Sequence, residues 1–416
     1  MIDDKEIEWL NDLKRFGIRL ELGDMKYLMH KLNYPYKEYN VVHVGGTNGK
    51  GSVCQFIASV LLKAGYAVGT YTTPPLHDIH EIYRINNRLI NERELGSVIR
   101  KLKKEVSELI EKGKKITYFE ALTALALLYF QEKMVDYAII EVGLGGRCDA
   151  TNVVDAAVTV ITNVALEHEN FLGRTVATIA REKAGIITHA PVVTACRGEA
   201  LAVIREVAAE KNVPVYVVGE DIIWKRKDRR RFVVEADDSY IIQSPLDGIF
   251  QGENIALAVK VGEILGMGRD DIISGIAHAR LPGRMEKMGR FLLDGCHNPH
   301  AVQAFARSLE EYDYRRLVIL FGVMRDKNVR EMIRKLPDAE RYIAVTVGNE
   351  RSMDAEHIAR IGRELGKPFE VGGGMAEALD MAGRESSDSD LICIVGSLYA
   401  VGEARKILRE KTSFPK

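Results

Sequence analysis

The sequence lacks the features that mark secreted, disulfide-bonded and membrane-spanning proteins. Its five cysteines, at positions 54, 148, 196, 296 and 393, never form a CxxC pair, so neither a disulfide framework nor a zinc site is predicted. No apolar run approaches the ~20 residues that span a bilayer. The first ten residues are acidic and do not follow the pattern of a signal peptide. We therefore expect a cytoplasmic protein without a membrane partner.

The chain also lacks an excess of charge of one sign. Its 58 basic and 59 acidic residues give a net charge of −1, which is too small to attract nucleic acid or an anionic membrane. A basic cluster from Lys225 to Arg231 offers no aromatic platform for base stacking. We interpret it as the solvated tip of a hairpin and expect no nucleic-acid partner, so any nucleotide must bind at a local site.

Length and patterning predict two α/β domains. The chain has 416 residues, of which 46% are apolar and 28% charged, within the range of globular proteins. From residue 41 onward, short β-branched runs alternate with helical patterns, which predicts a mainly parallel sheet with crossover helices. Alternating segments between Asp221 and Pro245 predict a small antiparallel sheet. The stretch from Leu281 to Arg290 is suited to an interdomain linker, and we place the domains at residues 1–285 and 286–416.

The strongest functional motif is the glycine-rich loop HVGGTNGKGS, residues 43–52. It follows a predicted strand and opens a helical pattern, as a phosphate-binding loop must. Its glycines let backbone N–H groups approach phosphate oxygens. Lys50 supplies a positive charge for the β- and γ-phosphates, and Ser52 is placed to reach magnesium or phosphate. A tight turn with a surface lysine is the simpler alternative, but this combination of residues favours ATP binding.

Candidate polar groups follow three other predicted strands. Glu141 stands at the carboxyl end of a buried strand, where ligands bind in open sheets, and we interpret it as a magnesium ligand. His168 follows the next strand, although a lone histidine is more typical of a cap or core than of a metal site. In HNPH we interpret His297 as a nucleotide contact rather than one of a metal pair with His300. Asp294 is suited to ribose hydroxyls.

Six motifs in register resemble the folylpolyglutamate synthases and dihydrofolate synthases, the folate branch of the Mur ligase family. They are HVGGTNGKGS, TYFEALTALA, EVGLGGRCDATN, REKAGII, LPGRME and DGCHNPHA. The similarity extends from FGIRLELGDMKYLM before the loop to GSLYAVGEA near the end. It implies a Mur-ligase-like P-loop domain with a small antiparallel subdomain, followed by a Rossmann-like C-terminal domain that ligates glutamate.

The resemblance implies an ATP-dependent amide ligase. A pterin or folate carboxylate attacks the γ-phosphate to give an acyl phosphate and ADP, and the amine of L-glutamate then displaces phosphate. Such chemistry depends mainly on alignment and charge compensation. The implied cofactors are ATP and Mg²⁺, with a monovalent cation such as K⁺ as a further candidate, and a monomer is expected. The acceptor stays open between dihydropteroate, a reduced folate, or both.

The resemblance also assigns roles to individual residues. Lys183 matches the lysine that is carbamylated in these ligases, and the anionic carbamate would support a cation. With Lys50 and His168 it forms the expected catalytic set. The nucleotide would be bound by Thr47, Asn48, Gly49, Lys50, Gly51, Ser52, Asn254, Arg284, Asp294 and His297. Magnesium would be bound by Ser52, Thr73, Glu141 and His168, and the pterin by Thr117, Tyr118, Phe119, Glu120, Cys148, Asp149 and Ala150.

Four positions depart from the family pattern. Thr73 stands where serine is usual and keeps a hydroxyl, Pro75 where histidine is usual, Glu167 where aspartate is usual, and Cys148 replaces leucine. None of these changes removes a group that phosphate chemistry needs. The nearest alternative function is a UDP-muramyl peptide ligase. It is disfavoured because the 44 residues before Gly45 are few for a separate UDP-binding domain. A nucleotide-gated switch without ligase chemistry is a second alternative, and it would hydrolyse ATP without a carboxylate acceptor.

Overall fold

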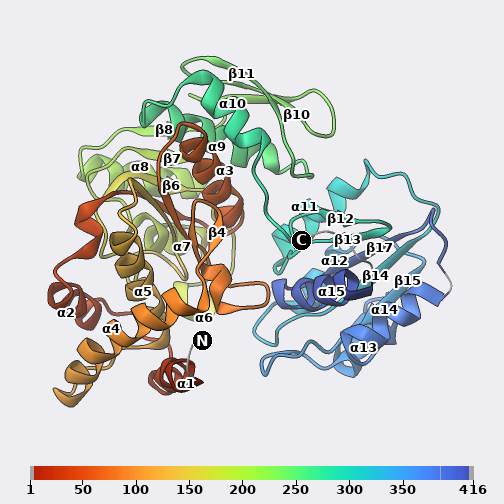
Figure 1. Cartoon of the computed structure of the whole chain (residues 1–416). Coiled ribbons are helices and arrows are strands. Elements are labelled where there is room, and N and C mark those ends of the chain that lie inside the picture. The colour runs from red at the N-terminus through yellow and green to blue at the C-terminus, as the bar shows by residue number, and fades with distance from the viewer. Residues whose placement is uncertain (1–3, 385, 412–416) are drawn as a thin grey trace.

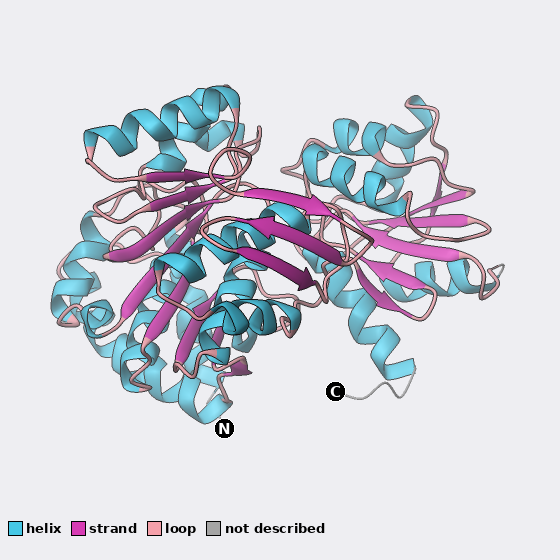
Figure 2. Ribbon diagram, turned by 90° about the horizontal axis from the view of Figure 1, so that it is seen from above, coloured by secondary structure: helices cyan, strands magenta, loops and turns pink. Residues whose placement is uncertain are grey.

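The computed structural model describes residues 4–384 and 386–411, which form two lobes. The N-terminal lobe comprises the elements α1 to α10, and the C-terminal lobe comprises β12 to α15. Each lobe has a sheet with helices on both faces, and a three-stranded antiparallel sheet lies between them (Figures 1 and 2). The predicted α/β fold class is thus confirmed. Within the described residues, no helix has both the length and the apolar character of a membrane span.

The N-terminal lobe is built on an eight-stranded sheet in the order β4-β3-β2-β5-β1-β6-β7-β8. The strands β2, β5, β1, β6, β7 and β8 are parallel, whereas β3 and β4 join antiparallel at one edge. Their bounds are β1 (Asn40–Gly45), β2 (Val68–Tyr71), β3 (Tyr83–Ile85), β4 (Arg88–Leu89), β5 (Tyr137–Glu141), β6 (Ala156–Ile161), β7 (Val192–Thr194) and β8 (Val215–Val217).

Helices cover both faces of this sheet. Neighbouring residues on a strand point to opposite faces: Ile140 packs with α4 and α5, while Ile139 packs with α3 and α9. Both faces are buried, which explains why the strand sequences are continuous apolar runs. The helices are α1 (Asp4–Asp12), α2 (Gly23–Lys31), α3 (Lys50–Lys63), α4 (Glu92–Glu111), α5 (Tyr118–Glu132), α6 (Glu169–Leu172), α7 (Val176–Ala184), α8 (Gly198–Glu210), α9 (Gln251–Ile264) and α10 (Arg269–Ala277).

The C-terminal lobe has a six-stranded sheet in the order β12-β13-β17-β14-β15-β16. Only β12 is antiparallel to its neighbour, and it lies inside the predicted linker, so that stretch is partly a strand. The bounds are β12 (Glu286–Met288), β13 (Phe291–Leu293), β14 (Leu317–Phe321), β15 (Arg341–Ala344), β16 (Phe369–Val371), β17 (Leu391–Val395), α11 (Pro299–Leu309), α12 (Val329–Lys335), α13 (Ala355–Glu364), α14 (Met375–Arg384) and α15 (Leu398–Lys411).

The three-stranded sheet confirms the antiparallel prediction. It consists of β9 (Ile223–Arg226), β10 (Arg231–Glu235) and β11 (Ser239–Gln243), with β10 in the centre. The interpretation of its basic cluster as a solvated hairpin tip is confirmed for Lys225, Lys227 and Arg231, which are exposed, but it is wrong for Arg226. Arg226 forms an ion pair with Glu311, which follows α11 in the C-terminal lobe. The cluster therefore joins the small sheet to the second lobe.

Asp247 is the centre of this junction. Its side chain is 1% exposed and receives ion pairs from Arg229 and Arg230, and the hydroxyl of Tyr312 donates to its Oδ2 at 2.8 Å. Burial opposes ionisation, yet the hydrogen bonds from Arg230 and Tyr312 hold the pKa of Asp247 below its ordinary value. The Arg229 guanidinium also lies 3.7 Å from the centre of the Tyr312 ring, a cation–π contact. This buried carboxylate thus links the two lobes.

We predict that Asp247→Asn destabilises the protein. The variant leaves the guanidinium groups of Arg229 and Arg230 without their buried anionic partner. We expect the free energy of unfolding to fall by about 2–3 kcal/mol, which is less than for a fully buried ion pair because both arginines are partly exposed. Urea unfolding measures this change. The matched control is Asp238→Asn. The Asp238 side chain is 57% exposed and pairs with Arg269, so this variant should lower the free energy of unfolding by less than about 1 kcal/mol. Equal losses in the two variants would contradict the assignment.

Candidate functional site

The phosphate loop between β1 and α3 is held in a conformation that requires glycine. Gly46 and Gly49 have φ of 131° and 88°, values that favour glycine. A Cβ atom on Gly46 would lie 1.9 Å from Thr162 Oγ1, at the end of β6, and one on Gly49 would lie 2.4 Å from Asn254 Oδ1, on α9. The loop is therefore wedged between β6 and α9. This brings Asn254 next to the loop, although 205 residues separate it from Gly49 (254 − 49).

Hydrogen bonds fix the rest of the loop. The carbonyl oxygen of Asn48 accepts from Thr162 Oγ1 at 2.7 Å and from Asn163 Nδ2 at 3.2 Å. The Lys50 ammonium donates to the carbonyl oxygen of Thr47 at 3.2 Å, so its charge lies over the loop. A preformed turn with an ammonium group over it is suited to a phosphate chain.

Glu141 lies beside this loop at the end of β5. It is 6% exposed, and its Oε2 accepts the backbone N–H of Thr73 at 3.3 Å. A Cβ atom on Gly51, which precedes Ser52, would lie 3.8 Å from the same oxygen. Burial raises the pKa of Glu141, against the opposing influence of Lys50 and Arg284. The predicted residues from β2, β5 and α3 therefore converge.

This donor set fits a hard divalent cation. Magnesium prefers carboxylate and hydroxyl oxygens, which Glu141, Ser52 and Thr73 carry. Within the described residues, no cationic side chain forms an ion pair with Glu141. A bound cation would supply the positive charge that this buried acid lacks.

His168 lies in a second cluster, around Glu167. The Oε1 atom of Glu167 is 3.7 Å from His168 Nε2, 3.2 Å from His297 Nε2 and 3.0 Å from Lys327 Nζ. Despite burial, His297 and Lys327 hold the pKa of Glu167 well below its ordinary range. Burial, reinforced by Lys327, lowers the pKa of His168 to about 4. His168 is therefore neutral near pH 7 and keeps a lone pair for a metal.

The predicted magnesium ligands thus form two groups. Thr73 and Glu141 are in contact, whereas His168 belongs to the Glu167 cluster. Across residues 4–384 and 386–411, no three His, Cys, Asp or Glu side chains are arranged to hold a metal ion by themselves. His297 acts electrostatically on both Glu141 and Glu167, so it links the two groups. Substrate oxygens would have to complete any coordination sphere.

Lys183 lies on the inner side of the phosphate loop. It is 5% exposed, and its Nζ donates to the carbonyl oxygen of Gly46 at 2.9 Å. Burial, together with the charge of Lys50, lowers the pKa of Lys183 to about 7. Much of the side chain is consequently an uncharged amine at neutral pH, the form that reacts with carbon dioxide.

The C-terminal lobe contacts the phosphate loop directly. Asn298 Nδ2 donates to Asn48 Oδ1 at 2.8 Å, and Asn48 Nδ2 lies 3.2 Å from His300 Nδ1. Asn298 also caps α11 by accepting the N–H of Ala301 at 2.9 Å. The same asparagine therefore orders the start of α11 and one side of the loop, a role that sequence reasoning missed.

Arg284 and Asp294 meet at the junction of the lobes. Burial raises the pKa of Asp294, which is 4% exposed, against the influence of Arg284. Its oxygens accept the N–H groups of Met285 and Cys296 at 3.0 and 2.9 Å. In this arrangement Asp294 orders the turn after β13 and leaves little surface for a ribose.

Several predicted pterin residues have structural contacts of their own. Thr117 and Glu120 form a capping box at the start of α5, with Glu120 Oε2 accepting the Thr117 N–H at 2.8 Å. Asp149 accepts the N–H of Leu144 at 2.8 Å and that of Thr151 at 2.9 Å. These side chains are therefore held by contacts within the protein, and Cys148, next to Asp149 in the chain, is half-buried.

An N-terminal segment joins this region. Arg19 donates to Asp24 Oδ2 at 2.9 Å and to the carbonyl oxygen of Lys115 at 3.0 Å. Asp24 in turn accepts the N–H of Lys115 at 3.1 Å, two residues before the Thr117 cap. Arg19 and Asp24 were not among the predicted site residues. Both residues lie in the motif FGIRLELGDMKYLM, which was used only to show where the resemblance to the family begins.

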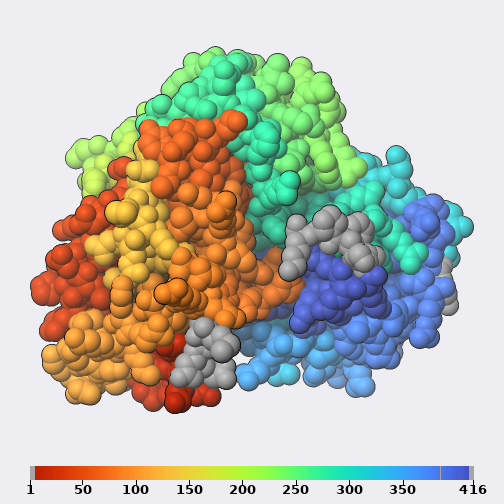
Figure 3. Space-filling view, viewed as in Figure 1, coloured from red at the N-terminus to blue at the C-terminus, as the bar shows by residue number. Residues whose placement is uncertain are grey.

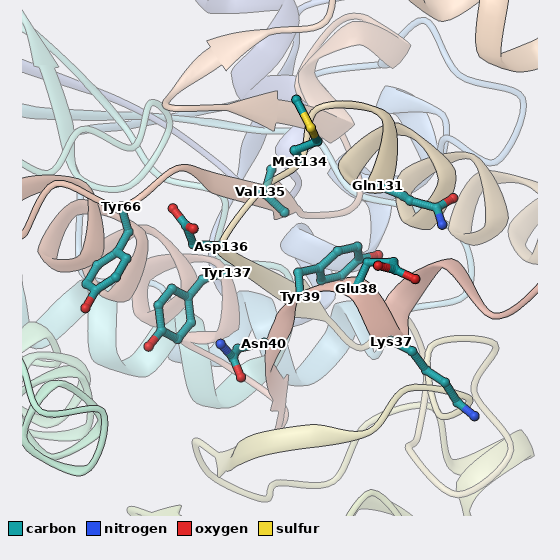
Figure 4. A pocket seen from close by; sticks show the side chains of 10 residues that line it. All are labelled: Lys37, Glu38, Tyr39, Asn40, Tyr66, Gln131, Met134, Val135, Asp136 and Tyr137. Atoms are coloured by element: carbon teal, nitrogen blue, oxygen red, sulfur yellow. The ribbon is translucent and has the colours of Figure 1, made fainter.

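A separate hollow of about 580 Å³ lies at the opposite end of the sheet, where β1 and β5 begin (Figure 4). Asn40 and Tyr137, at the amino-terminal ends of β1 and β5, line it together with Tyr66 and Met134. The phosphate loop follows the carboxyl end of β1, so this hollow is not part of the candidate site. Ligands of open parallel sheets bind at the carboxyl ends of the strands.

Two family models match the chain. Residues 44–262 match the Mur ligase middle domain, and residues 283–398 match the Mur ligase glutamate ligase domain. The structure resembles that of E. coli FolC in complex with DHPP and ADP, with a TM-score of 0.89 and 28% identity, covering 98% of each chain. Because 98% of each chain is covered, the structural similarity extends through both lobes.

Two relatives show how far the similarity extends. A protein of Bacillus subtilis, "Dihydrofolate synthase/folylpolyglutamate synthase", is 33% identical over 96% of this chain and 98% of its own length. A protein of Haloferax volcanii, "Probable bifunctional folylpolyglutamate synthase/dihydropteroate synthase", is 36% identical over 96% of this chain but only 50% of its own length. This chain thus spans about half of the second relative. It belongs to the Mur ligase family, in the branch of the folylpolyglutamate and dihydrofolate synthases.

Proposed function

We propose that this chain is an ATP-dependent ligase that joins L-glutamate to the carboxylate of a pterin or folate. The observation that carries this proposal is the convergence of the phosphate loop, Glu141 and Thr73 at neighbouring strand ends of a family-typical fold. The complex of E. coli FolC with DHPP and ADP supports the same substrate classes. The muramyl ligase alternative is not favoured, because the similar proteins reported above are folate ligases or their bifunctional relatives.

ATP would lie with its phosphates along the glycine-rich loop. The exposed backbone of the loop and the Lys50 ammonium would bind the phosphate oxygens, while Asn254 on α9 would lie near the base. Asn254 is 5% exposed and lies against Gly49, so the nucleotide would have to enter along the edge of α9.

Ser52, Thr73 and Glu141 would hold magnesium, and His168 would approach it from the second cluster. The ion supplies charge compensation for the transferring phosphoryl group. The carboxylate of Glu141 is buried beside this region, and Lys50 and Arg284 counter its negative charge.

Two transfers would follow. A carboxylate oxygen of the acceptor attacks the γ-phosphorus, and the bond to the β-phosphate oxygen breaks, which gives an acyl phosphate and ADP. The uncharged amine of glutamate then attacks the acyl carbon, phosphate leaves, and the nitrogen loses a proton. Lys327 brings positive charge from the C-terminal lobe to the Glu167 cluster beside this region, and His297 contacts the same carboxylate.

Lys183 would act as a carbamate. Its depressed pKa, near 7, makes the amine available to carbon dioxide, and the product is an anion. An anion at this place would be attracted to Lys50 and to magnesium, whereas an ammonium group would be repelled. The hydrogen bond to Gly46 would then position the carbamate against the loop.

We predict that Lys50→Ala lowers ligation at least about 100-fold, because it removes the charge that balances the transferred phosphate. Formation of ADP and of the glutamylated product would be measured together. The fold should persist, since Lys50 is half-buried rather than part of a core. Lys63→Ala, at the exposed end of the same helix, is the control and should retain full activity. Full activity of Lys50→Ala would exclude the proposed role.

We predict that Lys183→Ala also loses ligation and that short carboxylic acids partly restore it. Mass spectrometry under bicarbonate should show one carbon dioxide adduct on the wild-type protein and none on the variant. Because the pKa of Lys183 is about 7, occupancy of the adduct should fall as pH drops below 7, where the amine becomes protonated. Absence of an adduct together with an active alanine variant would refute the carbamate.

The acceptor would be identified by product analysis. Purified protein is incubated with ATP, magnesium and labelled glutamate, and dihydropteroate or a reduced folate monoglutamate is added in turn. We expect labelled product and ADP in equal amounts with at least one acceptor. ATP hydrolysis that does not depend on any acceptor would instead support a nucleotide-gated switch.

A further inference from the structure

The loop that carries Thr73 also contacts the C-terminal lobe. This loop, residues 72–78, follows β2 and reaches α15 through Leu76. Leu76 packs in an apolar cluster whose other members in the described chain all come from residues 288–408. In Figure 1 an orange loop of the N-terminal lobe extends to α15, and in Figure 3 the orange and dark-blue surfaces meet.

Gly402 on α15 makes this contact possible. A Cβ atom on Gly402 would lie 2.2 Å from the carbonyl oxygen of Leu76 and 3.4 Å from His77 Nδ1. Gly402 has no left-handed backbone angle, and glycine inside a helix costs about 1 kcal/mol relative to alanine. Close approach of the loop backbone is therefore the physical reason for glycine here. Gly283 adds a second close approach, with Leu76 Cδ2 3.3 Å from the position of a Cβ atom.

The same short loop is anchored on the N-terminal lobe. The N–H of Leu76 donates to Glu81 Oε2 at 2.9 Å, and the N–H of Thr73 donates to Glu141 Oε2 at 3.3 Å. Only two residues, Pro74 and Pro75, thus separate Thr73, which contacts Glu141, from Leu76, which contacts α15. So short a segment cannot absorb a shift of α15 without moving Thr73.

We propose that Leu76 and Gly402 are positioning residues that couple closure of the C-terminal lobe to the placement of Thr73 beside Glu141. This inference rests on the proposed function and deepens it. With the lobes together, Leu76 packs against α15, and Thr73 lies beside Glu141 at the phosphate loop. With the lobes apart, the loop keeps only its hydrogen bonds to Glu81 and Glu141, and Thr73 is held less firmly. The arrangement would delay phosphoryl transfer until the lobe that ligates glutamate has closed.

The test uses Gly402→Ala and a matched control in the same lobe. Gly374→Ala is the control, since a Cβ atom there meets nothing within 4 Å and the residue has no left-handed angle. Hydrogen exchange of residues 72–82, followed by mass spectrometry without substrates, reports on the loop independently of ligase activity. We expect exchange in Gly402→Ala to rise about tenfold and exchange in the control to stay at the wild-type rate.

Steady-state kinetics separate positioning from stability. In Gly402→Ala, kcat should fall about tenfold or more, while the Kd for ATP stays within about twofold, because the phosphate loop is untouched. Leu76→Ala removes the side chain that packs in the apolar cluster of the C-terminal lobe, and it replaces Gly402→Ala as the test variant if that variant does not fold. Unchanged loop exchange in the folded variants, or equal effects in Gly374→Ala, would overturn the proposal. If the wild-type protein itself lacks ligase activity, the proposed function fails, and loop exchange alone still decides the coupling.

Discussion

The candidate site depends on one steric constraint, the close approach of the phosphate-loop backbone to β6 and α9. Gly46 and Gly49 allow this approach, because any side chain there would overlap Thr162 or Asn254. The loop is consequently rigid before any ligand arrives. A preformed turn avoids the entropic cost of ordering a loop around a triphosphate, and it also holds Lys183 against Gly46.

Positive and negative side chains surround this loop. Lys50 lies over the loop and Lys183 beneath it, while Glu141 and Glu167 are buried carboxylates at its rim. Glu167 has a direct cationic partner in Lys327 and a second close partner in the His297 ring. Glu141 has only more distant ones, and its raised pKa reflects that difference. An acid kept without a close counter-charge is suited to receive a cation together with the nucleotide.

The lobes meet at separate points of different chemistry. Asp247 and its arginines form a buried polar junction at the small sheet, and Asn298 joins the phosphate loop through amides. Apolar contacts are made by Leu76, in the cluster that includes α15, and by Phe250, which packs against the core of the C-terminal lobe. Polar contacts near the loop can exchange partners with a nucleotide, whereas the Asp247 junction lies apart from it. The small sheet thus joins the second lobe at a point separate from the phosphate loop.

The sequence alone determined what depends on neighbouring residues: the α/β alternation, the glycine-rich turn, the small antiparallel sheet and the family resemblance. These follow from local periodicity, backbone freedom and short motifs. Only the tertiary structure decided which distant groups meet, as Lys327 meets Glu167 across 160 residues and Leu76 meets Gly402. It also overturned the solvated interpretation of Arg226, whose partner Glu311 is 85 residues away. One sequence records no such pairing, because packing that closes long loops leaves no periodic trace in either segment.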